Sequence, residues 1–251
     1  MPYSRTPGVC LRKIDFSETS QVLRFFTRAH GKVSCIAKGA KRRRGAFPVP
    51  FDILAVYDLV RIEKRPGTLD LVTQAERLKT FPRLPGDYPR FTAACYAAEF
   101  VDEFCPEGMP VEDLYDRLTE VLGRLDGETP VPDAVFSFEA RAIKALGCFP
   151  RLRECGICRR EIRRPEAFFS LRDGGAVCPE CRPRNDPWFT VRRASLESIA
   201  RFGEGDMPRE ILKRPLVEEI RQVFDACVRY HLERELKSAR FIRGVLSSVS
   251  R

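Results

Sequence analysis

Two pairs of cysteines have a spacing in this sequence that suits a metal ion. Cys155 and Cys158 form one Cys-x2-Cys pair, Cys178 and Cys181 form a second, and nineteen residues separate the pairs. Each such turn directs two thiolates toward one point, and two turns complete the tetrahedral cage of four sulfurs that structural zinc prefers. Four thiolates leave no open position for water, so the spacing predicts one structural Zn²⁺ without a catalytic role.

Two disulfides or a redox-active pair are the alternative interpretations of these cysteines. A redox Cys-x2-Cys normally follows a strand in a βαβ unit, a pattern that we do not find in this sequence. The other six of the ten cysteines are isolated, and most of them lie in apolar runs, as buried free thiols do. This usage favours a reducing compartment, so we expect a cytoplasmic protein.

A run of cations is the second feature whose chemistry is evident. Five of seven consecutive residues are basic, and glycines interrupt and follow them: Lys38, Lys41, Arg42, Arg43 and Arg44. We interpret the run as a loop that contacts DNA phosphates. A solvated loop or a localisation signal is the alternative when the run is taken alone. Further cations could extend the same track: Arg24, Arg28, Lys32, Arg61 and Lys64.

The distribution of charge favours the phosphate-binding interpretation. The net charge of the chain is +9, but residues 1–80 carry +9, residues 81–147 carry −7 and residues 148–251 carry +7. A basic first third suits a polyanionic partner, and the acidic middle segment suits a protein partner instead. Phe25, Phe26 and Tyr57 could stack on bases within the basic third, although packing in a core is the commoner role for each of them.

Motifs for catalysis are missing from the sequence. It contains neither Gly-x4-Gly-Lys-[Ser/Thr] nor Gly-x-Gly-x-x-Gly, so no nucleotide site is evident. We find no pairing of a nucleophile with a base, and we predict that the chain is not an enzyme. No stretch approaches the roughly 18 apolar residues of a membrane span, and the first residues lack the apolar segment of a signal peptide.

Periodicity indicates the elements that hold these residues in place. Five short strand-like runs lie within residues 9–80 and predict a small closed barrel. Two prolines and a glycine in residues 81–87 predict a linker. The period then becomes helical, with apolar faces over 91–105 and 114–125, a third helix that Asp133 caps, and a long helix that Pro215 opens. Between the last two, a hairpin is expected at residues 168–177.

The predicted fold is therefore a multidomain α+β protein. An OB-fold DNA-binding barrel occupies residues 1–80, and a helical domain occupies residues 81–251. A four-cysteine zinc ribbon or finger is inserted in that domain at residues 148–187.

The ordered motifs resemble those of the RecO family of bacterial DNA repair and recombination mediators. Gly31-Lys32-Val33, followed by Ala37-Lys38-Gly39-Ala40-Lys41-Arg42, resembles the family's strand and basic loop. The cysteine quartet occurs in many members, and Leu236-Lys237-Ser238-Ala239-Arg240 resembles the family's Leu-Lys-Ser ending. The order of barrel, helices, zinc insert and closing helices matches over essentially the whole chain.

This resemblance implies an OB fold, a helical domain and a function without nucleotide hydrolysis. Members bind single- and double-stranded DNA, anneal complementary strands and, with RecR, help to load RecA on DNA coated by single-strand-binding protein. A bacterial, nucleoid-associated location is implied as well. In some relatives the acidic tail of single-strand-binding protein docks on the helical domain, and we expect basic residues of the last helices there: Arg221, Arg229 and Lys237.

Two other classes of protein compete with a strand-annealing mediator. The runner-up is a zinc-ribbon transcription factor or RNA-binding factor that uses the same barrel. A nuclease or ligase accessory enzyme is the third, and the lack of an acidic metal-binding cluster near the barrel argues against it.

Overall fold

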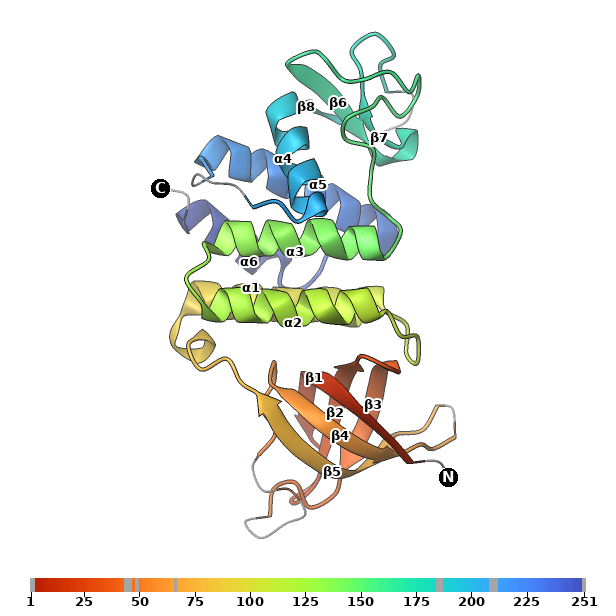
Figure 1. The fold of residues 1–251 in the computed structure, drawn as a ribbon, viewed down its shortest axis with the longest axis vertical. Helices are drawn as coiled ribbons and strands as arrows, with labels where there is room; N and C mark the ends of the chain where they lie inside the picture. Colours follow the sequence, from red (N-terminus) through yellow and green to blue (C-terminus); the bar gives the residue numbers. More distant parts are fainter. Residues whose placement is uncertain are drawn as a thin grey trace. The chain divides into compact units, whose positions relative to one another are not determined.

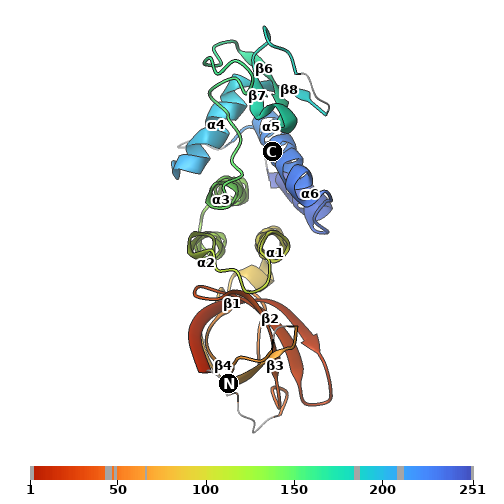
Figure 2. The same cartoon turned by 90° about the vertical axis from the view of Figure 1, so that its right-hand side faces the viewer.

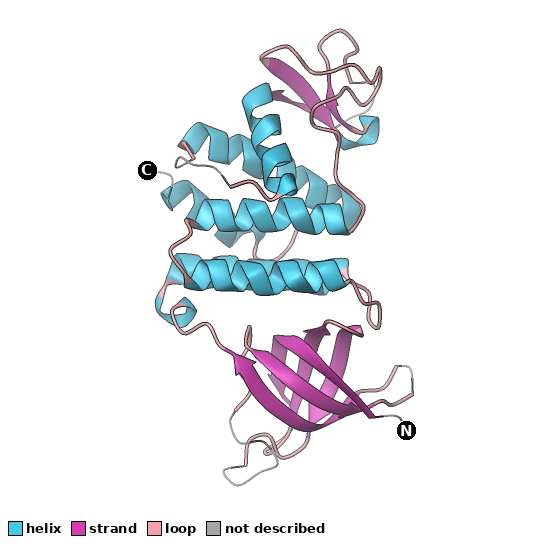
Figure 3. Cartoon of the chain, in the orientation of Figure 1, coloured by secondary structure: helices cyan, strands magenta, loops and turns pink. Residues whose placement is uncertain are grey.

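The computed structural model describes residues 3–42, 47, 50–65, 67–183, 187–207 and 212–249. Packing divides the chain into two compact units, Met1–Gly127 and Glu128–Arg251. Strands form a barrel in the first unit and a small sheet in the second, and both units contain helices (Figure 3). The predicted α+β class is confirmed, with an N-terminal OB barrel followed by helices that carry a cysteine-rich insert.

Five strands form a closed barrel in the first unit (Figures 1 and 2). They are β1 (Tyr3–Asp15), β2 (Gln21–Thr27), β3 (Gly31–Ala37), β4 (Val56–Ile62) and β5 (Asp70–Lys79), hydrogen-bonded in the order β1-β2-β3-β5-β4. The long β1 closes the ring, because its first half pairs with β4 and its second half pairs with β2, both antiparallel. β3 and β5 pair in parallel. This is OB-fold topology.

Two helices follow the barrel in the same unit. The Pro-Gly segment contains a short turn, η1 (Leu84–Gly86), and leads into α1 (Tyr88–Phe104) and α2 (Glu112–Asp126). The carboxylate of Asp87 accepts a hydrogen bond from the backbone N–H of Arg90 at 3.1 Å, which satisfies one of the open donors at the start of α1. The apolar positions that predicted these two helices are mostly buried.

The barrel core is aromatic and aliphatic, because alternate residues of each strand point inward. The rings of Phe25 and Tyr57 are at most 1% exposed and lie 6.1 and 5.1 Å from the ring of Phe51. Phe26 is fully buried and packs against Tyr115 of α2, with ring centroids 6.4 Å apart. Core packing, rather than base stacking, is therefore the role of Phe25, Phe26 and Tyr57.

The second unit combines four helices with a small antiparallel sheet. Its elements are α3 (Val131–Ala145), β6 (Glu166–Ser170), the turn η2 (Leu171–Asp173), β7 (Gly175–Val177), β8 (Phe189–Arg192), α4 (Arg193–Glu204), α5 (Arg214–Leu232) and α6 (Ala239–Val249). The sheet has the order β7-β6-β8. The hairpin confirms its prediction, and α5 begins at Arg214, one residue before the predicted Pro215. In the part of the chain that the structure describes, no helix has the length and apolar character needed to cross a membrane.

Three features of this unit differ from the sequence predictions. Asp133 does not cap α3, because Pro130 is the N-cap and Asp133 lies buried in the first turn. Burial there raises the pKa of the Asp133 carboxyl to about 6. The strand β8 and the helix α4 were not predicted, since β8 has only four residues and gains its partner, β6, from about twenty residues upstream.

Candidate metal centre and nucleic-acid interface

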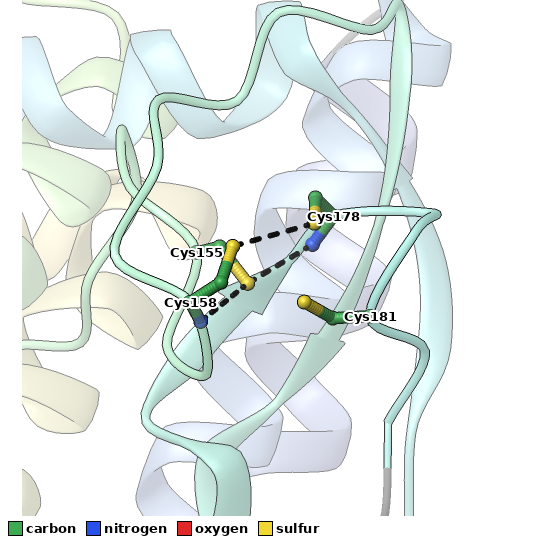
Figure 4. A group of neighbouring side chains, drawn as sticks. All are labelled: Cys155, Cys158, Cys178 and Cys181. Carbon is green, nitrogen blue, oxygen red and sulfur yellow. Dashed lines mark hydrogen bonds between the residues drawn. The ribbon is translucent and has the colours of Figure 1, made fainter.

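The four paired cysteines meet at one point of the second unit (Figure 4). Cys155 and Cys158 lie in the segment before β6, and Cys178 and Cys181 follow β7. Their Sγ atoms all lie within 4.8 Å of one another, and none is in a disulfide. The Sγ atoms of Cys158 and Cys178 are 3.8 Å apart, which matches the separation of about 3.8 Å that tetrahedral Zn–S bonds of about 2.3 Å impose.

Hydrogen-bond donors lie beside two of these sulfurs, those of Cys155 and Cys158, and lower the pKa of both thiols. The Sγ of Cys155 accepts bonds from the backbone N–H groups of Cys158 at 3.5 Å and Cys178 at 3.4 Å (Figure 4). The Nε of Arg160 lies 3.4 Å from the Sγ of Cys158, and this contact lowers the pKa of that thiol to about 6. The donor set therefore fits a closed, structural Zn²⁺ site.

Gly156 lets the first cysteine turn pack against η2. A Cβ at this position would lie 1.8 Å from the carbonyl oxygen of Asp173. The backbone N–H of Gly156 also donates to the carbonyl of Ala176 at 2.7 Å. The glycine thus relieves crowding between the turn and the neighbouring hairpin.

The predicted basic loop follows β3. Lys38 and Arg42 are exposed, and neither forms an ion pair with a carboxylate among the residues that the structure describes. Lys41 is exposed as well, and its Nζ lies 2.9 Å from a carboxylate oxygen of Asp15 at the end of β1. Arg43 and Arg44 lie outside the described residues.

Three other cations of the predicted track bind the acidic helices of the same unit. Arg24 and Lys32 both contact the Asp102 carboxylate of α1, at 3.1 and 3.4 Å. Arg28 lies 3.2 Å from Asp116 of α2. The acidic segment thus finds cationic partners on the barrel, and the DNA-binding role of these three cations stays a prediction.

The last two cations of the predicted track lie near the mouth of the barrel. Arg61 occupies an inward position of β4, its side chain is 6% exposed, and it pairs with Asp70 and Glu63. The backbone N–H of Lys64 donates to Asp70 at 2.8 Å, and the residue is half-buried. The guanidinium of Arg61 thus forms a cluster of ion pairs with Asp70 and Glu63 inside the first unit.

The residues predicted to bind a protein tail are not equivalent in the structure. Arg221 is buried and forms two hydrogen bonds, of 2.9 and 2.8 Å, with the fully buried Glu139 carboxylate. This placement differs from the expected surface site, because the guanidinium is enclosed between α3 and α5. Arg229 and Lys237 are exposed, and Arg229 lies 3.9 Å from Glu235.

Comparisons with known proteins cover nearly the whole chain. The family models described as "Recombination protein O N terminal" and "Recombination protein O C terminal" match residues 1–81 and 85–240. The DNA repair protein RecO of Anaeromyxobacter dehalogenans is 33% identical over 245 residues, which are 94% of each chain. The protein of the same name from Desulforudis audaxviator is 33% identical over 258 residues, 99% of this chain and 100% of that relative. For Moorella thermoacetica the identity is 30% over 242 residues, 95% of this chain and 90% of the relative. The chain therefore belongs to the RecO family of DNA repair proteins.

Proposed function

We propose that this chain is a recombination mediator that binds single- and double-stranded DNA and anneals complementary strands without hydrolysing a nucleotide. The exposed basic loop at one end of an OB barrel carries the proposal, since Lys38 and Arg42 present unpaired cations there. Membership of a family of DNA repair proteins supports it.

The mechanism that we propose is electrostatic. Phosphates of each strand contact the cations of the basic loop and release the counterions that were bound to the DNA. Repulsion between two strands held at such a surface falls, and complementary bases then meet by diffusion. No bond is made or broken, so the absence of a nucleophile–base pair in the sequence agrees with this function.

The proposal extends to partners and location. The proposal includes cooperation with RecR, displacement of single-strand-binding protein and indirect loading of RecA in the cytoplasm, at the nucleoid. Arg229, on α5, and Lys237, in the turn between α5 and α6, are exposed cations and suit an acidic protein tail. Arg221 is buried against Glu139, so the proposal leaves it out of this docking role.

We further propose that Cys155, Cys158, Cys178 and Cys181 hold one structural Zn²⁺. Such an ion supplies folding free energy to a small sheet whose own core is limited. The residues of this chain position the ligands: Arg160 and the backbone N–H groups stabilise the thiolates, and Gly156 brings the first turn against the hairpin.

A strand-annealing assay tests the proposed function. Two complementary oligonucleotides, one with a fluorophore and one with a quencher, are mixed with the full chain at low salt. We expect faster annealing than without protein. Replacing Lys38, Lys41 and Arg42 together with Ala is expected to slow protein-dependent annealing by about tenfold or more, because three phosphate contacts are lost.

The matched control removes three exposed arginines of α4 and α5, Arg193, Arg201 and Arg214, and changes the net charge equally. This control should anneal like the unmodified chain. Absence of annealing by the unmodified chain, or equal losses in both variants, contradicts the proposal.

A further inference from the structure

Two apolar side chains protrude from the barrel at the end of β1. Phe16 is 66% exposed and Ile14 is 52% exposed. Phe25, Phe47, Phe51 and Tyr57, in contrast, are packed in the barrel core. The two side chains lie two residues apart, and neighbouring exposed apolar side chains can mark an interaction site.

The turn that carries Phe16 is held in place by hydrogen bonds. The backbone N–H groups of Phe16 and Ser17 donate to the carbonyl of Ser20 at 3.0 and 3.3 Å. The N–H of Ser20 donates to the Ser17 hydroxyl at 3.1 Å. The ring is therefore presented by an ordered turn, and its binding needs little further ordering of the backbone.

The basic loop contacts the turn that carries this ring. The backbone N–H of Lys41 donates to the carbonyl of Thr19 at 3.1 Å, which joins the loop to the turn. The Nζ of Lys41 contacts Asp15, the residue before Phe16, and Gln21 holds the same carboxylate at 2.9 Å. The aromatic ring and the loop that we propose for phosphates are thus parts of one surface.

The same face of the sheet continues as an apolar row across the strands. Ile14 pairs with Val22 on β2, and Val22 pairs with Ile36 on β3. Paired residues of adjacent strands point to the same side of a sheet. The next row along β2 and β3 contains Arg24 and Ser34, whose side chains are hydrogen-bonded.

An apolar row with an exposed aromatic ring near its end, next to the turn that the basic loop contacts, has the chemistry of single-stranded nucleic acid. Phosphates need cations, and unpaired bases offer π-faces that stack on aromatic rings. Bases in a duplex are already stacked on one another and cannot reach Phe16. We propose that Phe16, with Ile14 beside it, stacks on an unpaired base, so that this face binds single strands more tightly than duplex. This inference rests on the proposed DNA-binding function.

Binding of a fluorescent oligothymidine and of a duplex of equal length to the full chain tests the inference. We expect Phe16→Ala to weaken oligothymidine binding by about 5- to 150-fold, the effect of one lost base stack, and to change duplex binding less than about twofold. Tyr88→Ala is the matched control, because Tyr88 is also an exposed aromatic residue of the first unit. This variant should bind both DNAs like the unmodified chain.

A spectroscopic readout separates stacking from a general loss of affinity. Trp188 is the single tryptophan of the chain, so Phe16→Trp combined with Trp188→Phe places one fluorophore at the proposed stack. Oligothymidine should quench its emission, and an abasic oligonucleotide should not.

Three results overturn the inference. They are equal loss of single-strand and duplex binding in Phe16→Ala, no loss of either, and emission that oligothymidine leaves unchanged. Failure of the unmodified chain to bind any DNA would instead refute the underlying function.

Discussion

Arg221 and Glu139 form a buried ion pair between α5 and α3. The side chains are 6% and 0% exposed, and Arg221 also lies 3.2 Å from Asp225. Removing one partner of such a pair leaves an uncompensated charge in a region of low dielectric, whereas removing both is often tolerated.

Glu139→Gln should therefore lower the free energy of unfolding of the second unit by about 3 kcal/mol. Replacing Glu139 and Arg221 together with Met should recover much of this loss, because neither charge then remains buried unpaired. Urea unfolding followed by circular dichroism measures both.

The matched control is Glu218→Gln, since Glu218 and Arg214 are each 53% exposed. Its effect should stay below about 1 kcal/mol. Equal effects of Glu139→Gln and Glu218→Gln would contradict the importance of burial.

Single residues differed in how well the sequence revealed their roles. The cysteine quartet was predictable because the geometry of a Cys-x2-Cys turn is local. The ion pairs of Arg61 and Arg221 were not, because a charge pattern does not show which face a residue occupies. A signal existed for Arg61, which has the same strand parity as the buried Tyr57 and Leu59.

The acidic helices α1 and α2 are attached to the barrel by charge as well as by apolar packing. Asp102 accepts contacts from both Arg24 and Lys32, and its side chain is 13% exposed. Gly31, at the tight turn between β2 and β3, has φ +63°, and a Cβ there would lie 2.0 Å from the Met109 carbonyl. Gly31, the first residue of the Gly31-Lys32-Val33 motif, therefore allows the turn to pack against the backbone of Met109.

Asp102→Asn should loosen the attachment, because a neutral amide cannot compensate two cations. We expect amide hydrogen exchange in peptides of α1 to become about tenfold faster, which corresponds to about 1.4 kcal/mol. Mass spectrometry of the exchanged peptides measures this.

Asp113→Asn provides the comparison, since Asp113 is 64% exposed in its pair with Arg117. Exchange in α1 should stay unchanged in this variant. An unchanged rate in Asp102→Asn as well would show that the ion pairs do not hold α1.

The cysteine-rich sheet depends on its proposed metal. The full chain should contain about one zinc ion by elemental analysis, and Cys158→Ser should lose both the metal and the protection of β6 and β7 from proteolysis. Cys95→Ser, at a half-buried free thiol of α1, should retain both. A metal-free chain with a fully folded sheet would refute the structural role.

Elements with a strong period were predicted and elements made by distant pairing were not. The five barrel strands and the helices α1, α2, α3 and α5 follow from alternation or from an apolar face. The four-residue β8 lacks such a pattern and exists because β6 offers it an edge. The closed barrel was predicted, but the pairing of β1 with both β4 and β2 that closes it is long-range, and no local pattern specifies that register.

The net charge of +9 is distributed unevenly along the chain. The barrel segment 1–80 carries all of this excess, but the unit Met1–Gly127 carries only +3, because α1 and α2 are acidic. Arg28 and Lys32 meet those helices near the turn between β2 and β3, whereas Lys38, Lys41 and Arg42 follow the opposite end of β3. Of the cations that we propose for DNA binding, these three, which have no partner on the acidic helices in the described part of the chain, therefore lie at one end of the barrel.

The salt dependence of single-stranded DNA binding tests this account most directly. For the full chain, the logarithm of the affinity should fall with the logarithm of salt concentration by about 0.7 for each phosphate contact. Replacing Lys38, Lys41 and Arg42 with Ala should make that slope shallower by about 2, while the melting temperature stays nearly unchanged. A flat salt dependence of the full chain, or a loss of DNA binding confined to variants outside residues 1–80, would contradict the account.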